Sequence, residues 1–161
     1  MPATFAELQA LLRDLAHTHP VRPSATTEDA TEVEVHRHPV CVEWNAPEQR
    51  LELTVPLPDP LHAGCSEAAR CHLYRTLLAW QWAEPTGANH LSFGITPHGT
   101  DDAVVGLASI EAQPLHDAQA LYAAIEQAHD ALFAVWVRLG AQVIEDTACA
   151  AAVPTGPVLA V

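Results

Sequence analysis

Apolar residues recur along the chain with a period that changes from one segment to the next. Phe5, Leu8 and Leu12 fall at helical spacing, which predicts an amphipathic helix over residues 4 to 17. Residues 18 to 31 show no such period and are rich in Pro, Ser and Thr, so we expect a mobile loop there.

Three segments then alternate apolar and polar residues, which is the period of a strand with one buried face. Their sequences are EVEVH, VCVEW and RLELTV, at residues 32–36, 40–44 and 50–55. The sequence NAPEQ predicts a turn between the last two. The prolines of PLPDP then end the sheet, because proline cannot donate to a ladder. Alternation of this kind predicts an antiparallel sheet with one buried face and one wet face.

A second helix is predicted over residues 66 to 84, with Ser66 as its N-cap. Its apolar residues cover much of its circumference, so we expect it to be buried on more than one side, with a second copy of the chain as the simplest extra partner.

A hairpin is predicted next, with its turn at the sequence PHGTDD. The last helix begins near Asp117 and is expected to end at Gly140. Residues 141 to 161 are rich in alanine and predict a flexible tail.

The predicted elements follow the order helix, three strands, helix, two strands, helix. This order predicts the α+β class, with three helices packed on a twisted antiparallel sheet. Residues 1 to 140 would form this one domain. The length of 161 residues is sufficient for a substantial core.

The charge of the chain excludes several classes of function. The net charge is -13 at pH 7, and all seven basic residues are arginines. Nucleic-acid binding needs a basic surface and an anionic membrane would repel this chain, so neither partner is expected. The lack of lysine excludes Schiff-base and P-loop chemistry. The first residues do not resemble a secretory signal, so a cytoplasmic location with free cysteines is expected.

No stretch of the chain matches a catalytic motif, and we do not expect an enzyme. Among the ten histidines, His36 and His38 would share one face of a strand, with Cys41 nearby. Zinc needs three or four converging ligands, whereas solvent-exposed strand histidines are common, so no metal and no cofactor is predicted. Cys71 falls within an apolar helical pattern, which is typical of an inert buried thiol.

The segment from Leu73 to Trp136 resembles the class I chaperones of type III secretion, the Tir-chaperone family. It contains a leucine-rich helix (LYRTLLAWQW), two strands (LSFGI and AVVGLASI) and the entry to a last helix (PLHDAQAL). The residues at the family's characteristic places are Leu77, Leu78, Phe93, Gly94, Val104, Val105, Leu115, Leu121 and Trp136. With the first helix and the three-strand block, the resemblance covers about residues 4 to 140.

The resemblance implies a homodimer that binds the N-terminal region of a secreted effector in extended form and keeps it soluble and secretion-competent. The family receives its effector on apolar patches of the first helix and the three-strand block. The matching residues here, most of which are also expected in the core, are Phe5, Leu8, Leu12, Val33, Val35, Val40, Val42 and Trp44. Candidates for the core and the dimer interface together are Leu73, Leu77, Trp80 and Trp82. The acidic composition predicts acidic side chains around the effector site.

A second class of function stays open at this point. The protein could instead be a small α+β protein, not a chaperone, that binds a metal or a small ligand through its His, Cys and Trp residues. Core and interface packing is the more frequent role of tryptophan. Bound metal that is lost on changing His36 and His38 would favour this alternative.

Overall fold

The computed structural model describes residues 5–24, 30–59, 61, 66–83, 90–98, 101–112 and 115–151. In chain order the elements are α1 (Phe5–Leu15), β1 (Val21–Pro23), β2 (Thr31–Val35), β3 (His38–Asn45), β4 (Arg50–Pro56), α2 (Glu67–Ala83), β5 (His90–His98), β6 (Asp101–Glu111) and α3 (Ala118–Ala151). Within these residues, three helices and an antiparallel sheet form the predicted α+β fold. The order of elements is the expected one, apart from the additional strand β1.

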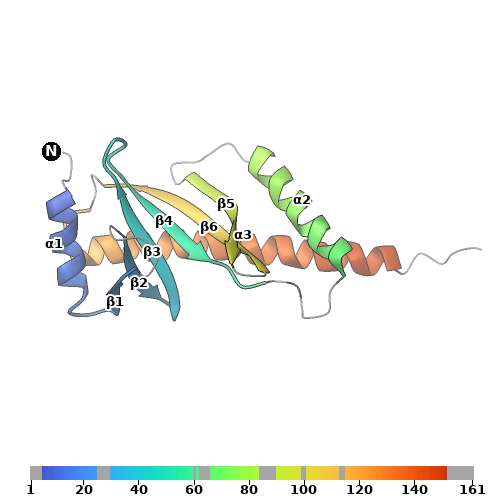
Figure 1. Ribbon diagram of the computed structural model, residues 1–161, viewed down its shortest axis with the longest axis horizontal. Coiled ribbons are helices and arrows are strands. Elements are labelled where there is room, and N and C mark those ends of the chain that lie inside the picture. Colours follow the sequence, from blue (N-terminus) through green and yellow to red (C-terminus); the bar gives the residue numbers. More distant parts are fainter. Residues whose placement is uncertain are drawn as a thin grey trace, which may run out of the picture.

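The six strands form one sheet in the order β1-β2-β3-β4-β6-β5, and every neighbouring pair is antiparallel. Figure 1 shows α3 running behind the strands, with α1 at the β1–β3 end of the sheet and α2 at the β5 end. Helix α3 contacts both other helices as well as β2 and β6. It therefore connects the two ends of the molecule.

The alternating residues of the central strands bury one face of the sheet, as the sequence predicts. The fully buried strand residues are Val33, Val35, Val40, Leu51, Leu53 and Val55. Helix α3 packs Leu121, Ile125, Leu132 and Trp136 into the same core. The polar atom of Trp136 is satisfied there, because its Nε1–H donates a 2.7 Å hydrogen bond to the carbonyl of Pro58.

The predicted loop over residues 18–31 contains a strand, so that part of the prediction is wrong. Val21–Pro23 form β1 and pair with the beginning of β2. A strand of three residues is too short to show the period of two on which the prediction depended. Residues 25–29 of the same segment lie outside the described residues.

Gly140 does not end the last helix, since α3 continues to Ala151. Glycine costs about 1 kcal/mol in a helix relative to alanine. Leu139 and Val143, on either side of it, are both buried in the core and hold this part of the helix in place. The first part of the predicted tail is therefore helical, and residues 152–161 lie outside the described residues. None of the described helices is long and apolar enough to cross a membrane.

A candidate binding groove between the first helix and the sheet

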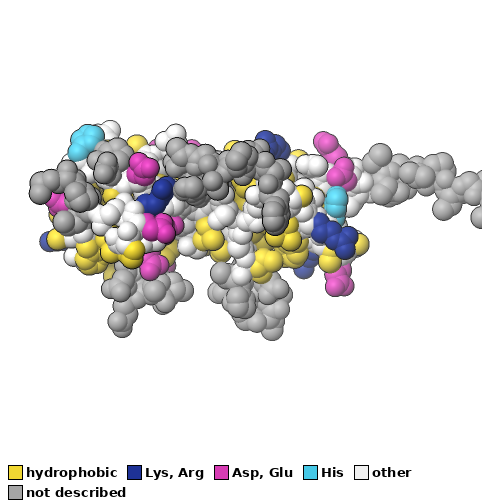
Figure 2. All heavy atoms as spheres, turned by 90° about the horizontal axis from the view of Figure 1, so that it is seen from above, with side chains coloured by type: hydrophobic (Ala, Val, Ile, Leu, Met, Phe, Trp, Pro, Cys, Tyr) yellow, Lys and Arg dark blue, Asp and Glu magenta, His cyan; other side chains and the backbone are white. Residues whose placement is uncertain are grey.

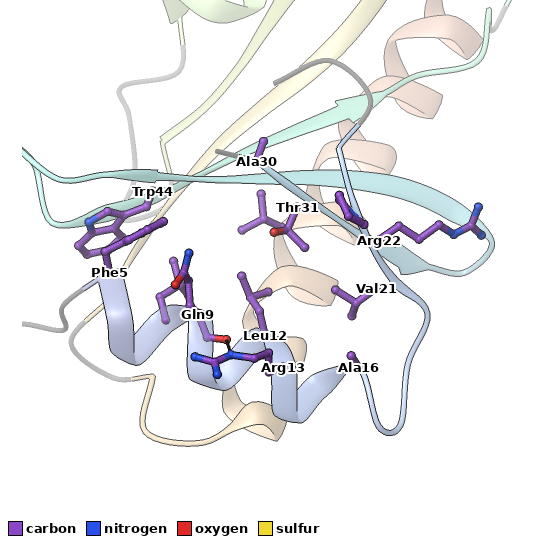
Figure 3. A pocket seen from close by; sticks show the side chains of 13 residues that line it. Phe5, Gln9, Leu12, Arg13, Ala16, Val21, Arg22, Ala30, Thr31 and Trp44 are labelled. Carbon is purple, nitrogen blue, oxygen red and sulfur yellow. Dashed lines mark hydrogen bonds between the residues drawn. The ribbon is translucent and has the colours of Figure 1, made fainter. Parts of the chain in front are cut away.

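An apolar groove of about 470 Å³ lies between α1 and the strands at the β1 edge of the sheet. Figure 3 shows Phe5 and Trp44 together at one end of the groove, and Ala16 and Val21 at the other. Among the described residues its lining consists of Phe5, Leu8, Gln9, Leu12, Arg13, Ala16, Val21, Arg22, Pro23, Ala30, Thr31, Val42 and Trp44. Its volume lies within the range of about 300–1,000 Å³ that is usual for binding sites.

Helix α1 forms one wall of the groove along its whole length. Leu8 and Leu12 are buried beneath the helix, while Phe5 is 41% exposed at the mouth of the groove. From Phe5 to Ala16 the helical rise gives a wall about 16 Å long. An extended peptide of about five residues would span that length.

Strands β1, β2 and β3 form the opposite wall. Thr31 of β2 and Val42 of β3 are register partners, and Trp44 follows Val42 on the same face because it is two residues further along the strand. Val21 adds a side chain from β1, which pairs with β2 on its other side. The antiparallel register of these three strands thus sets the shape of the wall.

Strand β1 is an edge of the sheet and can offer backbone groups to a partner, but only a few. The N–H of Glu34 in β2 donates to the carbonyl of Pro20 at 3.0 Å. Antiparallel alternation then turns the backbone groups of the next residue, Val21, away from β2. Pro23 has no N–H, so the ladder that a partner could form here is short. Affinity in this groove must come mainly from apolar contacts.

The charged residues that line the groove are basic, and the acidic Glu34 lies beside one of them. Both charged side chains among its described lining residues are arginines, in a chain with a net charge of -13. Arg22 is 69% exposed and lies 3.4 Å from a carboxylate oxygen of Glu34. The Nε–H of Arg13 donates to the carbonyl of Gln9 at 3.1 Å. The groove therefore favours acidic groups beside the apolar ones of a ligand.

The structure divides the predicted partner-binding residues into two groups. Those that line the groove are Phe5, Leu8, Leu12, Val42 and Trp44. Val33, Val35 and Val40 are fully buried in the core instead. The alternating pattern cannot separate these two roles, because the groove and the core share one face of the sheet.

Sequence reasoning missed the groove residues that come from the segment predicted as a loop. These are Val21, Arg22, Pro23, Ala30 and Thr31. The signals for them were weak: an isolated Val-Arg-Pro and a strand that begins one residue earlier than its alternating pattern suggested. Only the pairing of β1 with β2 brings these residues to α1.

Helix α2 buries one stripe within a single chain and leaves its other side exposed; the second partner expected for that side stays a prediction. The N-cap is the predicted one, since the N–H of Ala69 donates to Ser66 Oγ at 3.3 Å. Leu73 and Leu77 lie in the core, at 2% and 3% exposure. Leu78, on the other side of the helix, is 58% exposed.

The two tryptophans predicted at the α2 interface differ in how well the structure describes them. Trp80 is half-buried with its ring edge against Phe93, at a centroid distance of 5.4 Å. Its Nε1–H is buried and has no acceptor among the described residues. The side chain of Trp82 lies outside the described residues.

The histidines and cysteines also differ from their predicted settings. His36 is exposed in the tight β2–β3 turn, with φ of 48°, and does not lie on a strand face. His38 is half-buried, with its ring stacked on Phe133 at 4.7 Å, so the solvent-exposed interpretation is wrong for it.

The two described cysteines are not part of a histidine cluster. No hydrogen bond among the described residues joins Cys41 to His36 or His38, and its Sγ lies 3.7 Å from the hydroxyl of Ser24. Cys71 is exposed, which corrects the expectation of a buried thiol.

Apolar atoms are also visible in a view of the whole surface. Figure 2 shows them in two areas of one face, one over the part that contains α1 and the β2–β4 strands and one over the part that contains β5 and α2. Among the described residues, the large apolar side chains that are exposed are Phe5, Leu78, Ile95, Val137 and Ile144. Comparison of the sequence with models of known protein families and with curated proteins finds no match.

Proposed function

We propose that this protein is a class I type III secretion chaperone, which binds the N-terminal region of a secreted effector and keeps it soluble and secretion-competent. The observation that carries the proposal is the groove between α1 and the β1 edge of the sheet. Phe5, which is 41% exposed, and the half-buried Trp44 lie together at its end, on a chain that has a large acidic excess. An apolar surface of this kind is typical of a site that receives another protein.

The shape of the groove favours an extended segment over a folded partner. It is open along one side and about as long as five residues of extended chain. One wall is a helix and the other ends in an edge strand, where a peptide can add a short ladder while its side chains enter the groove. Such a segment would be held by a few apolar side chains.

The charges near the groove suggest the composition of that segment. Arg13 and Arg22 flank the apolar lining, so acidic residues next to the apolar ones would find a complementary partner. Exposed ion pairs contribute only about 0–1 kcal/mol, so they would select the direction of binding more than its strength.

The same proposal includes a cytoplasmic homodimer formed through α2. A single chain leaves Leu78 58% exposed on α2. A second copy packed against this helix would cover Leu78. The two effector grooves would then lie far from the shared interface, because α1 and α2 are at opposite ends of the molecule.

The proposal is tested by binding to overlapping peptides from the N-terminal regions of secreted proteins encoded in the same genome. Phe5→Asp should weaken the best peptide by about tenfold or more, because it removes an apolar contact and places a charge at the groove mouth. Ile144→Asp is the matched control, because Ile144 on α3 is 42% exposed and Phe5 is 41% exposed.

Circular dichroism first establishes that both variants are folded. Loss of binding in Phe5→Asp with retention in Ile144→Asp supports the groove as the effector site. A folded Phe5→Asp variant that binds as tightly as the parent contradicts it.

A further inference from the structure

Three histidines and two carboxylates from distant parts of the sequence meet where the β2–β3 turn reaches α3. His36 Nε2 lies 3.4 Å from Asp130 Oδ1 and 3.5 Å from Glu126 Oε1. His129 Nδ1 lies 2.9 Å from the same Asp130 oxygen. One ligand atom each from His36, His129 and Asp130 falls within 4.8 Å of the others. Donor atoms of the types that bind first-row transition metals therefore converge here.

The helical and hairpin geometry explains this convergence. One face of α3 carries residues at spacings of three and four, namely Glu126, His129, Asp130 and Phe133.

The hairpin turn between β2 and β3 faces these residues. Its two central residues, His36 and Arg37, both have positive φ, of 48° and 69°. That turn carries His36 over the α3 face, and it places His38 at the start of β3 against His129 and Phe133.

His129 is the fixed member of the cluster. It is 3% exposed, and its ring is stacked on Phe133 with a centroid distance of 4.5 Å. Its second ring nitrogen, Nε2, lies 3.2 Å from His38 Nδ1. A metal-binding histidine usually donates its other N–H to an acceptor that fixes the ring and its tautomer. If His129 binds the metal through Nδ1, its Nε2–H can donate to His38 Nδ1. His38 would then be the acceptor that fixes the ring of His129.

We propose that this cluster binds a divalent transition-metal ion of the zinc class, through His129 Nδ1, Asp130 Oδ1 and His36 Nε2. In a tetrahedral zinc site with bonds of about 2.0–2.1 Å, neighbouring ligand atoms are about 3.3–3.4 Å apart. The separation of 3.4 Å between His36 Nε2 and Asp130 Oδ1 matches that edge length, and the 2.9 Å from His129 Nδ1 to the same oxygen is a hydrogen-bond distance that would lengthen by about 0.4 Å on binding. Imidazole nitrogen with a carboxylate is a ligand set that suits zinc and its neighbours better than magnesium or calcium.

The ligand atoms must move slightly to reach tetrahedral geometry, and most of the side chains that carry them are exposed and can rotate. His36 and Asp130 are 53% and 57% exposed, so small rotations can bring both onto an ion held at the buried His129. Glu126 Oε1, already 3.5 Å from His36 Nε2, can approach as a fourth ligand, or water can take that position. Binding would join the β2–β3 turn to α3, and it needs the tautomer of His129 that carries its proton on Nε2 and donates it to His38 Nδ1.

The test uses the full chain without a histidine tag, stripped with a chelator and titrated with Zn²⁺ by calorimetry. We expect one saturable equivalent that His36→Gln and Asp130→Asn each weaken by about tenfold or more. Both residues are exposed, so these variants should fold. His72→Gln is the matched control, because the half-exposed His72 pairs with Asp146 at 3.1 Å and no third ligand joins the two among the described residues.

Titration with Co²⁺ adds a spectroscopic criterion, since four-coordinate Co²⁺ gives an intense visible absorption and six-coordinate Co²⁺ a faint one. His38→Phe keeps an aromatic ring against Phe133 but removes the acceptor for His129, so it should lower affinity and preserve one equivalent. The proposal is overturned if no saturable equivalent is found, if both His36→Gln and Asp130→Asn retain it, or if His72→Gln weakens it equally.

Discussion

Gly106→Ala tests how closely α3 packs on the sheet. A Cβ added at Gly106 on β6 would lie 3.0 Å from both methyl carbons of Leu132 and 3.3 Å from its Cγ. Favourable carbon–carbon contacts lie at about 3.5–4.0 Å, so the new methyl overlaps three atoms by several tenths of an ångström. Leu132 is fully buried and has little room to move. Overpacking of this kind typically costs about 1–3 kcal/mol, and we expect Gly106→Ala to lower the free energy of unfolding by that amount.

Gly94→Ala on the neighbouring strand β5 is the matched control. A Cβ there would lie 3.5 Å from Val105 Cγ2 and 3.7 Å from Leu107 Cδ1, which are ordinary contacts. Removing a glycine from the unfolded chain then stabilises the protein by about 0.4–1 kcal/mol where the backbone tolerates it. Urea denaturation followed by circular dichroism measures both variants, and their free energies of unfolding should differ by about 1.4–4 kcal/mol.

Leu132→Ala separates this steric account from a general intolerance of β6. Shortening Leu132 costs about 2–5 kcal/mol by itself, but it also removes the atoms that the new methyl meets. Gly106→Ala should therefore cost markedly less in the Leu132→Ala background than in the parent, which a double-mutant cycle reports as coupling. An equal cost in both backgrounds, or a Gly106→Ala variant as stable as the parent, refutes the argument.

Three further predictions concern other parts of the molecule. Trp136→Phe should lower the free energy of unfolding by about 2 kcal/mol in the same urea assay, because it leaves a cavity and removes the bond to Pro58. Leu78→Asp should shift the chain from dimer to monomer in sedimentation velocity at unchanged circular dichroism, and a parent that is already monomeric contradicts the proposed dimer. Burial raises the pKa of the Cys41 thiol, so iodoacetamide should alkylate exposed Cys71 faster than Cys41 at neutral pH, as peptide mass spectrometry measures.

The main elements of the fold follow from the sequence because their patterns are long enough to show a period. Alternation across Val33, Val35 and Leu51 predicts strands with one buried face, and the structure buries these residues fully. The pattern fails at β1, which has only three residues. It also fails at Gly140, where buried neighbours outweigh a local preference to end the helix.

The sites were harder to predict than the elements. The sequence predicts Phe5 and Trp44 as partner-binding residues, but only the β1–β2 pairing shows the groove that contains them. The histidine cluster combines His36 with His129 and Asp130, residues that are separated by most of the sequence. No local spacing connects them, because the contact depends on how the hairpin turn meets α3.

Amide hydrogen exchange on the complex with the best-binding effector peptide tests the central claim most directly. The account predicts slower exchange in α1 and at Val21 of β1, because the peptide covers the groove and pairs with that edge. Exchange at the opposite edge strand, β5, should be unchanged. Protection confined to β5 and α2, with α1 and β1 exchanging as in the free chain, would contradict the groove as the effector site.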